Sequence, residues 1–357
     1  METGFANRLI SARKMAGLSL QAVADKLDNI ISKQSLNKYE QGKMKPDSAV
    51  LISLAQVLGV SVDYFYSEPA VAVNLVNVEF REFRSKLTKS GQVGLQEKAK
   101  EVFERYFELE NILNLNEQPS FFTYSRPICT IQDAEDAAKS LRIDWELGYD
   151  PIPDVVEMLE DKGYKVAEID APPAFNGLKA ESNGQKVIVL RKSREGEDIV
   201  RKRFTALHEL AHHSLTFPDD IEEKKKERLC HAFACAVLYP EEMAHKELHR
   251  DRFHFYQNEL VYIKERWGIS IAALFSRALT LGIINDYVYK KFIIGYKARK
   301  LHEPGKEPGR FRSNEVPVRF NRLIYLALAK EIISVNEAAY FSGVSVWRFR
   351  EQMQPFL

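Results

Sequence analysis

The 357-residue chain is poor in cysteine and in long apolar runs, and each scarcity excludes a class of protein. Its three cysteines, Cys129, Cys230 and Cys235, are an odd number without paired spacing, which argues against a disulfide framework and for a reducing compartment. The longest apolar stretch, residues 271–284, is interrupted by Arg277, and the N-terminus has no continuous apolar segment. We therefore expect neither a membrane span nor a signal peptide, and a cytoplasmic location.

The chain also lacks a strong net charge, but the small total of +1 hides an uneven distribution. Residues 1–66 carry a net charge of +2 and residues 281–357 carry +6, which leaves −7 for the residues between them. Basic ends are typical of contact with nucleic acid, although two solvated surfaces would give the same balance. At about 100 to 200 residues per domain, the length predicts two or three domains.

The hydrophobic pattern predicts a mostly α-helical protein with one small β-sheet. Apolar residues recur at spacings of three and four through residues 5–66, which predicts a bundle of about five short helices. Residues 79–115 have a charged helical pattern, and two β-like runs, 164–169 and 186–191, supply the sheet. Further helices are expected at 131–147, at 152–162 with Asp150 as its cap, at 199–215 and at 221–238.

These patterns divide the chain into four segments. Residues 1–68 form an all-α domain, 69–129 a helical connector, 130–285 an α+β domain, and 286–357 a basic C-terminal helical region. Within the last segment, residues 290–312 are basic and turn-rich, as in a linker, and residues 328–353 have small residues and glycine at helix-turn-helix spacing. Contact with DNA and packing against the α+β domain both stay open for that region.

The α+β segment contains the sequence His208-Glu209-Leu210-Ala211-His212, an HExxH motif inside a predicted helix. Two histidines four residues apart lie on one helix face, so both imidazoles can reach one cation. Glu209 points about 100° away and can hold a water molecule instead. A zinc site needs a third protein ligand, and two partly buried histidines satisfied by neighbours are the alternative.

The next predicted helix completes a pattern that resembles the ImmA/IrrE family of zinc metallopeptidases. In that family the HExxH helix is followed by a helix with glutamate, phenylalanine, alanine and a closing proline, and here these are Glu227, Phe233, Ala234 and Pro240. The chain departs from the family pattern at Cys230, His231 and Cys235, where the family usually has Ala, Asn and Ala. None of these departures removes a ligand.

This resemblance implies a zincin-like α+β peptidase domain that binds one Zn²⁺ per chain. It implies His208, His212 and Glu227 as the metal ligands and Glu209 as the general base of peptide hydrolysis. Zincins pair an extended substrate with a sheet edge, so we place the substrate cleft at the strand 186–191, although its sequence also fits an ordinary core strand.

Residues 5–66 resemble the Cro/repressor type of helix-turn-helix domain, also called XRE. The segment Gly17-Leu18-Ser19 matches the start of its second helix, and the run from Ser32 to Lys43 matches its recognition helix with the glycine stop. Leu36 and Tyr39 face inward in this interpretation, and Arg13 and Glu40 form a structural ion pair. The residues that we expect to contact DNA are Gln21, Ser32, Lys33, Gln34, Asn37 and Lys38.

Together, these features predict a DNA-binding zinc metalloendopeptidase that hydrolyses peptide bonds in a repressor or another regulatory protein. The fusion brings the peptidase to a promoter-bound target by raising its effective concentration. The alternative is a transcriptional regulator, such as one of the antitoxin type, whose peptidase-like domain senses a signal or partner without catalysis. Because such DNA-binding domains commonly read palindromes as dimers, homodimerisation through residues 79–115 is a further expectation.

Overall fold

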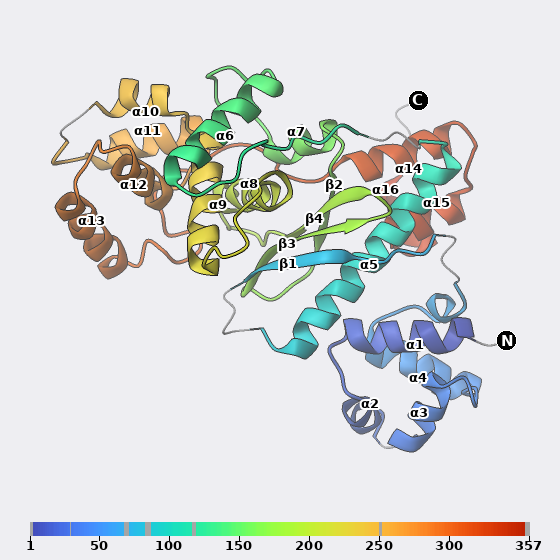
Figure 1. Ribbon diagram of the computed structural model, residues 1–357. Helices are drawn as coiled ribbons and strands as arrows, with labels where there is room; N and C mark the ends of the chain where they lie inside the picture. The colour runs from blue at the N-terminus through green and yellow to red at the C-terminus, as the bar shows by residue number, and fades with distance from the viewer. Residues whose placement is uncertain are drawn as a thin grey trace. The chain divides into compact units, whose positions relative to one another are not determined.

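The computed structural model describes residues 3–28, 30–67, 71–82, 87–115, 119–249 and 252–353. They belong to two compact units, one made of residues 1–76, 82–117 and 320–357 and the other of residues 77–81 and 118–319. The predicted fold class is confirmed, because helices predominate and the strands of the described residues form one small sheet (Figure 1). Within the described ranges, no helix has both the length and the apolar character needed to cross a membrane.

The first unit begins with the predicted bundle. Its elements are α1 (Thr3–Met15), α2 (Leu20–Lys26), α3 (Lys33–Glu40), α4 (Ser48–Leu58) and the 3₁₀ helix η1 (Asp63–Tyr66). Ser19 and Ser32 cap α2 and α3, because each hydroxyl accepts a hydrogen bond from a backbone N–H three residues later. Leu9, Leu54 and Phe65 are buried at the centre of the bundle, so its apolar spacing forms one core.

The remaining helices of this unit are α5 (Lys89–Ile112), α14 (Arg319–Ala329), α15 (Val335–Ser342) and α16 (Val346–Gln352). The prediction of one helical segment over residues 79–115 is wrong at its start, because residues 76–82 form a strand. The helix begins only after Thr88, whose hydroxyl accepts a hydrogen bond from the backbone N–H of Gly91. Gly91 therefore lies in the first turn of α5.

The sheet of the second unit has the strand order β1-β3-β4-β2. Its strands are β1 (Val76–Glu82), β2 (Lys165–Ile169), β3 (Phe175–Ser182) and β4 (Gln185–Arg191). Strand β4 pairs parallel with β2 and antiparallel with β3, and the turn between β3 and β4 has positive φ at Asn183 and Gly184, as a tight hairpin requires. The two predicted strands are confirmed, whereas β1 and β3 were not predicted.

The substrate cleft predicted at residues 186–191 is wrong, because β4 has a neighbouring strand on each side and offers no free edge. The outer edge of β3 is also taken, since β1 from the preceding part of the chain pairs with it (Figure 1). Phe80 of β1 makes an edge-to-face ring contact with Phe175 of β3, with ring centroids 6.3 Å apart. The chain itself therefore supplies the fourth strand.

The helices of the second unit pack on this sheet and on one another. They are α6 (Ile131–Asp144), α7 (Val155–Asp161), α8 (Val200–Ser214), α9 (Glu223–Leu238), α10 (Glu241–Leu248), α11 (Gln257–Trp267), α12 (Ile271–Thr280) and α13 (Asp286–Ala298). Asp154 caps α7 through the backbone N–H of Glu157, so the predicted cap Asp150 is wrong. Helix α13 also extends into residues 290–298, which were predicted to belong to a linker.

Two features fix the position of α8, which carries the HExxH motif. Small buried residues, Ala206 and Ala211 on α8 and Ala234 on α9, let the two helices pack closely. The buried Arg203 of α8 pairs with the buried Glu315 and donates hydrogen bonds to two backbone carbonyls of residues 152–153. Because a charge this deeply buried is costly without such partners, Arg203 holds α8 in one orientation.

Candidate functional site

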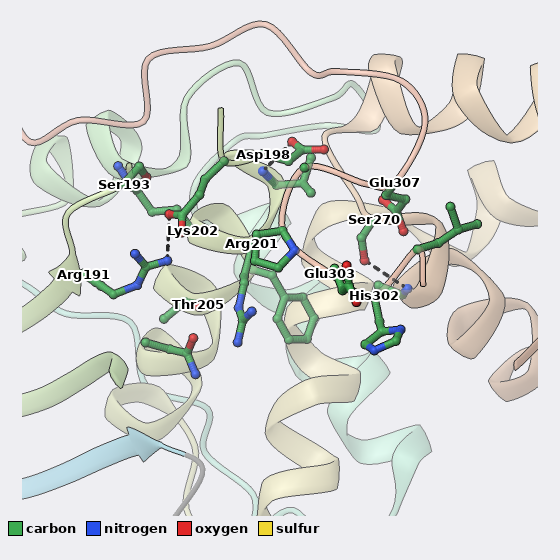
Figure 2. Close-up of a pocket in the computed structure, with 18 of the residues that line it drawn as sticks. Arg191, Ser193, Asp198, Arg201, Lys202, Thr205, Ser270, His302, Glu303 and Glu307 are labelled. Carbon is green, nitrogen blue, oxygen red and sulfur yellow. Dashed lines mark hydrogen bonds and ion pairs between the residues drawn. The ribbon is translucent and has the colours of Figure 1, made fainter. Parts of the chain in front are cut away.

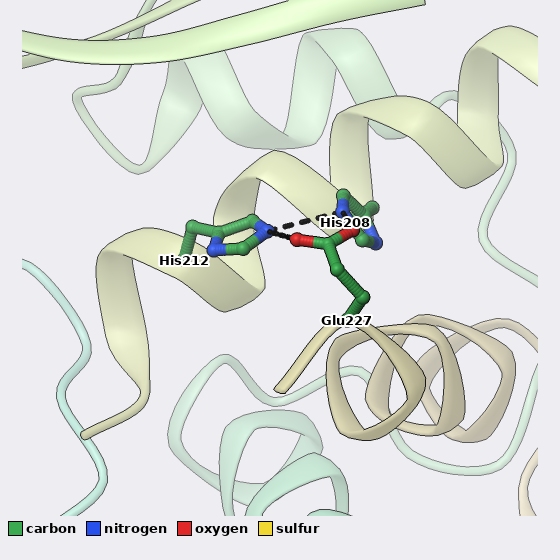
Figure 3. Close-up of side chains that lie close together, drawn as sticks. All are labelled: His208, His212 and Glu227. Atoms are coloured by element: carbon green, nitrogen blue, oxygen red, sulfur yellow. Dashed lines mark hydrogen bonds and ion pairs between the residues drawn. The ribbon is translucent and has the colours of Figure 1, made fainter. Parts of the chain in front are cut away.

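Helices α8 and α9 bring three predicted site residues together, as Figure 3 shows. The Nε2 atoms of His208 and His212 lie 3.1 Å apart. One carboxylate oxygen of Glu227 lies 3.3 Å from Nε2 of His208, and the other lies 3.3 Å from Nε2 of His212. Two imidazole nitrogens and a carboxylate from neighbouring helices therefore point at one common position.

This donor set fits a zinc ion. A tetrahedral zinc ion with ligands at about 2.0 to 2.1 Å has its ligand atoms about 3.3 Å from one another. The two imidazole Nε2 atoms lie 3.1 Å apart, and each lies 3.3 Å from a different oxygen of the Glu227 carboxylate, so the closest approaches between the three side chains are near this value. The imidazoles of His208 and His212 are buried, while the Glu227 side chain is 36% exposed, so the cluster is open to solvent on one side.

The electrostatics of the cluster favour a bound cation. Burial opposes the charged form of Glu227, but hydrogen bonds with His208 and His212 outweigh burial and hold the pKa of this carboxyl far below its usual range. Burial lowers the pKa of His212, yet hydrogen bonds with Cys230, Glu227 and Glu79 outweigh it and raise this pKa well above the usual value. The carboxylates of Glu227 and Glu79 thus stabilise positive charge at His212, which is the sign of charge that a bound cation also carries.

The predicted base, Glu209, is 1% exposed and lies on the side of α8 that faces β3. Strand β3 comes unusually close to α8 at Gly177. A Cβ atom built on Gly177 would lie 2.9 Å from Cγ2 of Thr205, 3.1 Å from the carbonyl oxygen of Val189 and 3.3 Å from Oε1 of Glu209. Glycine is therefore required by a close approach of backbone to helix rather than by a turn.

One residue beside the cluster was not found by sequence reasoning. Glu79 of β1 places Oε2 3.1 Å from Nδ1 of His212 and 2.8 Å from Nζ of Lys226, and its Oε1 lies 3.1 Å from Nζ of Lys179. Burial opposes the charged form of Glu79, but hydrogen bonds from His212 and Lys226 outweigh it and hold the pKa of this carboxyl well below its usual range. The alternation of apolar and polar residues in 76–81 is the signal that could have identified the strand.

The other histidines and cysteines near the motif have different surroundings. His213 is buried against the sheet, where its Nε2 lies 3.1 Å from the carbonyl oxygen of Val187, and burial lowers the pKa of this imidazole to about 3. The ring of His231 lies beside that of His208, with centroids 4.7 Å apart. The Sγ atom of the buried Cys230 lies 4.0 Å from Nδ1 of His212.

A cavity of about 250 Å³ lies beside the N-terminal half of α8 (Figure 2). The motif residues His208, Glu209 and His212 do not line it, and neither does Glu227. One of its lining residues, Thr205, lies one helical turn before Glu209 on α8. The polar side chains around it include Asn176, Arg201, Thr205, Ser270, His302 and Glu303.

The six residues predicted to contact DNA are all exposed, on α2, on α3 and at the N-terminal cap of α3: Gln21, Ser32, Lys33, Gln34, Asn37 and Lys38. Leu36 and Tyr39 of α3 are buried, so the polar residues occupy the opposite face of this helix. The predicted ion pair is confirmed, because Arg13 donates two hydrogen bonds to the carboxylate of Glu40, at 2.6 and 2.9 Å. The role of the six residues in DNA contact stays a prediction.

Two family models match the chain. The helix-turn-helix model matches residues 9–65, and the model of the IrrE N-terminal-like domain matches residues 159–278. The chain thus joins an XRE-type helix-turn-helix domain to an IrrE-like domain. Both resemblances drawn from the sequence are confirmed at this level. His208, His212 and Glu227 lie inside the IrrE-like domain, whereas Glu79 precedes it in the chain.

A curated relative supports the DNA-binding part. The chain is 43% identical over 60 residues to YonR, an uncharacterized HTH-type transcriptional regulator derived from the SPbeta prophage of Bacillus subtilis strain 168. The match covers 17% of this chain and 54% of the relative, so the chain spans about half the length of that protein. The two domains together support a DNA-binding regulator with a metallopeptidase-like domain.

Proposed function

We propose that this regulator is a zinc-dependent metalloendopeptidase that hydrolyses peptide bonds in a repressor or another regulatory protein. The observation that carries the proposal is the convergence of His208, His212 and Glu227 at separations of 3.1 to 3.3 Å. These three residues would hold one Zn²⁺ per chain. Zinc bound there supplies Lewis-acid chemistry, which polarises a carbonyl group and makes a water molecule acidic near neutral pH.

Glu209 is the residue that moves the proton in this proposal. Its carboxylate accepts a proton from the attacking water and passes it to the nitrogen of the leaving amine. The buried position of Glu209 next to β3 supports this role, because the narrow approach at Gly177 limits where its carboxylate can lie.

The helix-turn-helix domain would bind DNA through the exposed face of α3. Lys33 and Lys38 suit phosphates, and Gln34 and Asn37 suit base edges. DNA binding would hold the peptidase near a promoter-bound repressor and so raise its effective concentration.

The division of the chain into four segments and the formation of a homodimer remain proposals. The apolar residues Phe103 and Tyr106 of α5 are buried, so a dimer contact on this helix would use other side chains.

A second candidate function is regulation without catalysis. The pairing of β1 with β3 supports it, because the strand edge next to α8 is already paired within the chain. In that case the IrrE-like domain would sense a signal or a partner and change DNA binding without cutting a protein.

Comparison of wild-type protein with the Glu209→Gln variant tests the proposal. Both are loaded with zinc, assayed for metal content and incubated with purified repressors encoded in the same genome, and products are identified by mass spectrometry. We expect equal zinc content and cleavage by the wild type alone, since glutamine cannot accept the proton. Equal cleavage by both proteins would refute the mechanism, whereas zinc binding without any cleavage would favour the non-catalytic regulator.

A further inference from the structure

Strand β1 brings a carboxylate next to the candidate metal site from outside the IrrE-like domain. This strand, Val76–Glu82, precedes α5 in the chain and lies at the edge of the sheet next to β3. The contact between Phe80 and Phe175 anchors it. Glu79, its neighbour in sequence, extends towards α8 and α9, where it meets His212 and Lys226.

The two nitrogens of the His212 ring have different partners. Nε2 faces the cluster, 3.1 Å from Nε2 of His208 and 3.3 Å from Glu227. Nδ1 faces away from the cluster and lies 3.1 Å from Oε2 of Glu79. Cys230 is also near Nδ1, but its sulfur lies 4.0 Å away and is a weaker hydrogen-bond partner than a carboxylate.

A carboxylate at Nδ1 and a free Nε2 facing the other ligands are the arrangement that prepares a histidine to bind a metal. A proton on Nδ1 that is donated to a carboxylate leaves the Nε2 lone pair free for a cation, fixes the orientation of the ring and raises the basicity of Nε2. His208 and Glu227 cannot provide this effect for His212, because both face Nε2.

Two lysines keep Glu79 in place as a carboxylate. Lys226 of α9 lies 2.8 Å from the same oxygen that meets His212, and Lys179 of β3 lies 3.1 Å from the other oxygen. The Glu79 side chain is only 38% exposed, so these partners offset the cost of partly removing its charge from water. Since Lys226 precedes Glu227 directly, α9 holds both the third ligand and a partner of Glu79.

We propose that Glu79 is a positioning residue that orients His212 for zinc through its Nδ1 atom. This inference rests on the proposed zinc site. It extends the site beyond residues 159–278, because a strand from the preceding part of the chain would then complete the surroundings of the metal.

The 357-residue chain allows a direct test with three variants. Glu79→Ala removes the carboxylate, and Glu79→Gln keeps an acceptor of similar shape without the charge. Asn77→Gly is the matched control, because it removes the Asn77–Glu181 contact of the same strand at a position whose φ of 53° glycine tolerates. Zinc affinity is measured by competition with a chelator, and the Co²⁺ form of each protein is compared by its visible absorption spectrum. Thermal unfolding of the metal-free proteins reports on folding.

We expect Glu79→Ala to weaken zinc binding by about 10- to 100-fold and to change the Co²⁺ spectrum, with little change in metal-free unfolding. Glu79→Gln should fall between this variant and the wild type, and Asn77→Gly should match the wild type. Wild-type affinity and spectrum in Glu79→Ala would overturn the inference, as would equal weakening by Asn77→Gly. If Glu79→Ala does not fold, wild-type affinity in Glu79→Gln would overturn it, whereas intermediate affinity would support it. Failure of the wild type to bind zinc would instead refute the proposed function itself.

Discussion

The close approach of β3 to α8 predicts a large effect of one added methyl group. Gly177→Ala places a Cβ atom 2.9 Å from Cγ2 of Thr205 and 3.1 Å from the carbonyl oxygen of Val189. Neither neighbour is the end of a flexible side chain, since Thr205 is branched and buried on α8 and Val189 belongs to the central strand β4. Strand and helix must therefore move apart, and the shift also displaces Oε1 of Glu209, which lies 3.3 Å from the new atom.

The expected cost follows from this crowding. Overpacking a close-packed core by one methyl group costs about 1 to 3 kcal/mol. At roughly 2 to 4 °C per kcal/mol for a unit of this size, the midpoint of thermal unfolding should fall by roughly 2 to 12 °C. Any peptidase activity should fall by more than the loss of folded protein explains, because the position of Glu209 changes as well.

The assay compares thermal unfolding and activity of Gly177→Ala with those of a control variant, and repeats the comparison in a Thr205→Ser background. Gly295→Ala is the control, because a Cβ atom in this helix meets nothing closer than 3.7 Å and alanine favours the helix. Thr205→Ser removes the methyl group that clashes, so the penalty of Gly177→Ala should be smaller in the Thr205→Ser background. Wild-type stability and activity in Gly177→Ala would refute the reasoning.

Two further predictions concern a buried acid and the DNA-facing helix. Burial raises the pKa of Glu160 to about 7, against the hydrogen bonds that it accepts from the backbone N–H groups of Val318 and Arg319. An acid whose pKa is raised by folding does not lower the free energy of unfolding below its unfolded pKa of about 4.5. The full loss of unfolding free energy is reached above about pH 7. Glu160→Gln should therefore gain up to about 3 kcal/mol of unfolding free energy relative to the wild type between pH 5 and pH 8. Denaturant titrations at both pH values check this, with Glu157→Gln on the exposed face of the same helix as control, and a gain that does not depend on pH would contradict it. On α3, Lys38→Ala should weaken DNA binding uniformly across sequences and reduce the salt dependence by about one phosphate contact, whereas Asn37→Ala should change sequence preference. Binding measured over a range of salt concentrations separates the two, and identical effects of both variants would argue against these roles.

The sequence predicts the helical elements of the site well because their signals are local. The spacing of apolar residues and the HExxH motif locate α8 and α9 to within about two residues of each end. The placement of His208, His212 and Glu227 near one another follows from helical periodicity and from the small residues between the two helices.

The sheet is less predictable because its signals compete with turn and helix signals. Asn176 and Gly177 have the composition of a turn, yet they lie inside β3, where Gly177 is needed for the close approach of the helix. Strand β1 has a clear alternation of Val76, Val78 and Phe80 with polar residues, but it is followed by a long charged helix that dominates the local pattern. The contact of Glu79 with His212 has no local signal at all, because it depends on strand pairing between distant parts of the chain.

Measurement of zinc stoichiometry tests the central claim most directly. Wild-type protein and the Glu227→Ala variant are dialysed against the same buffered free zinc concentration, and bound metal is determined by elemental analysis. If His208, His212 and Glu227 act as one ligand set, the wild type retains one zinc ion per chain and the variant loses most of it. A wild type without zinc, or equal zinc in both proteins, would contradict the account.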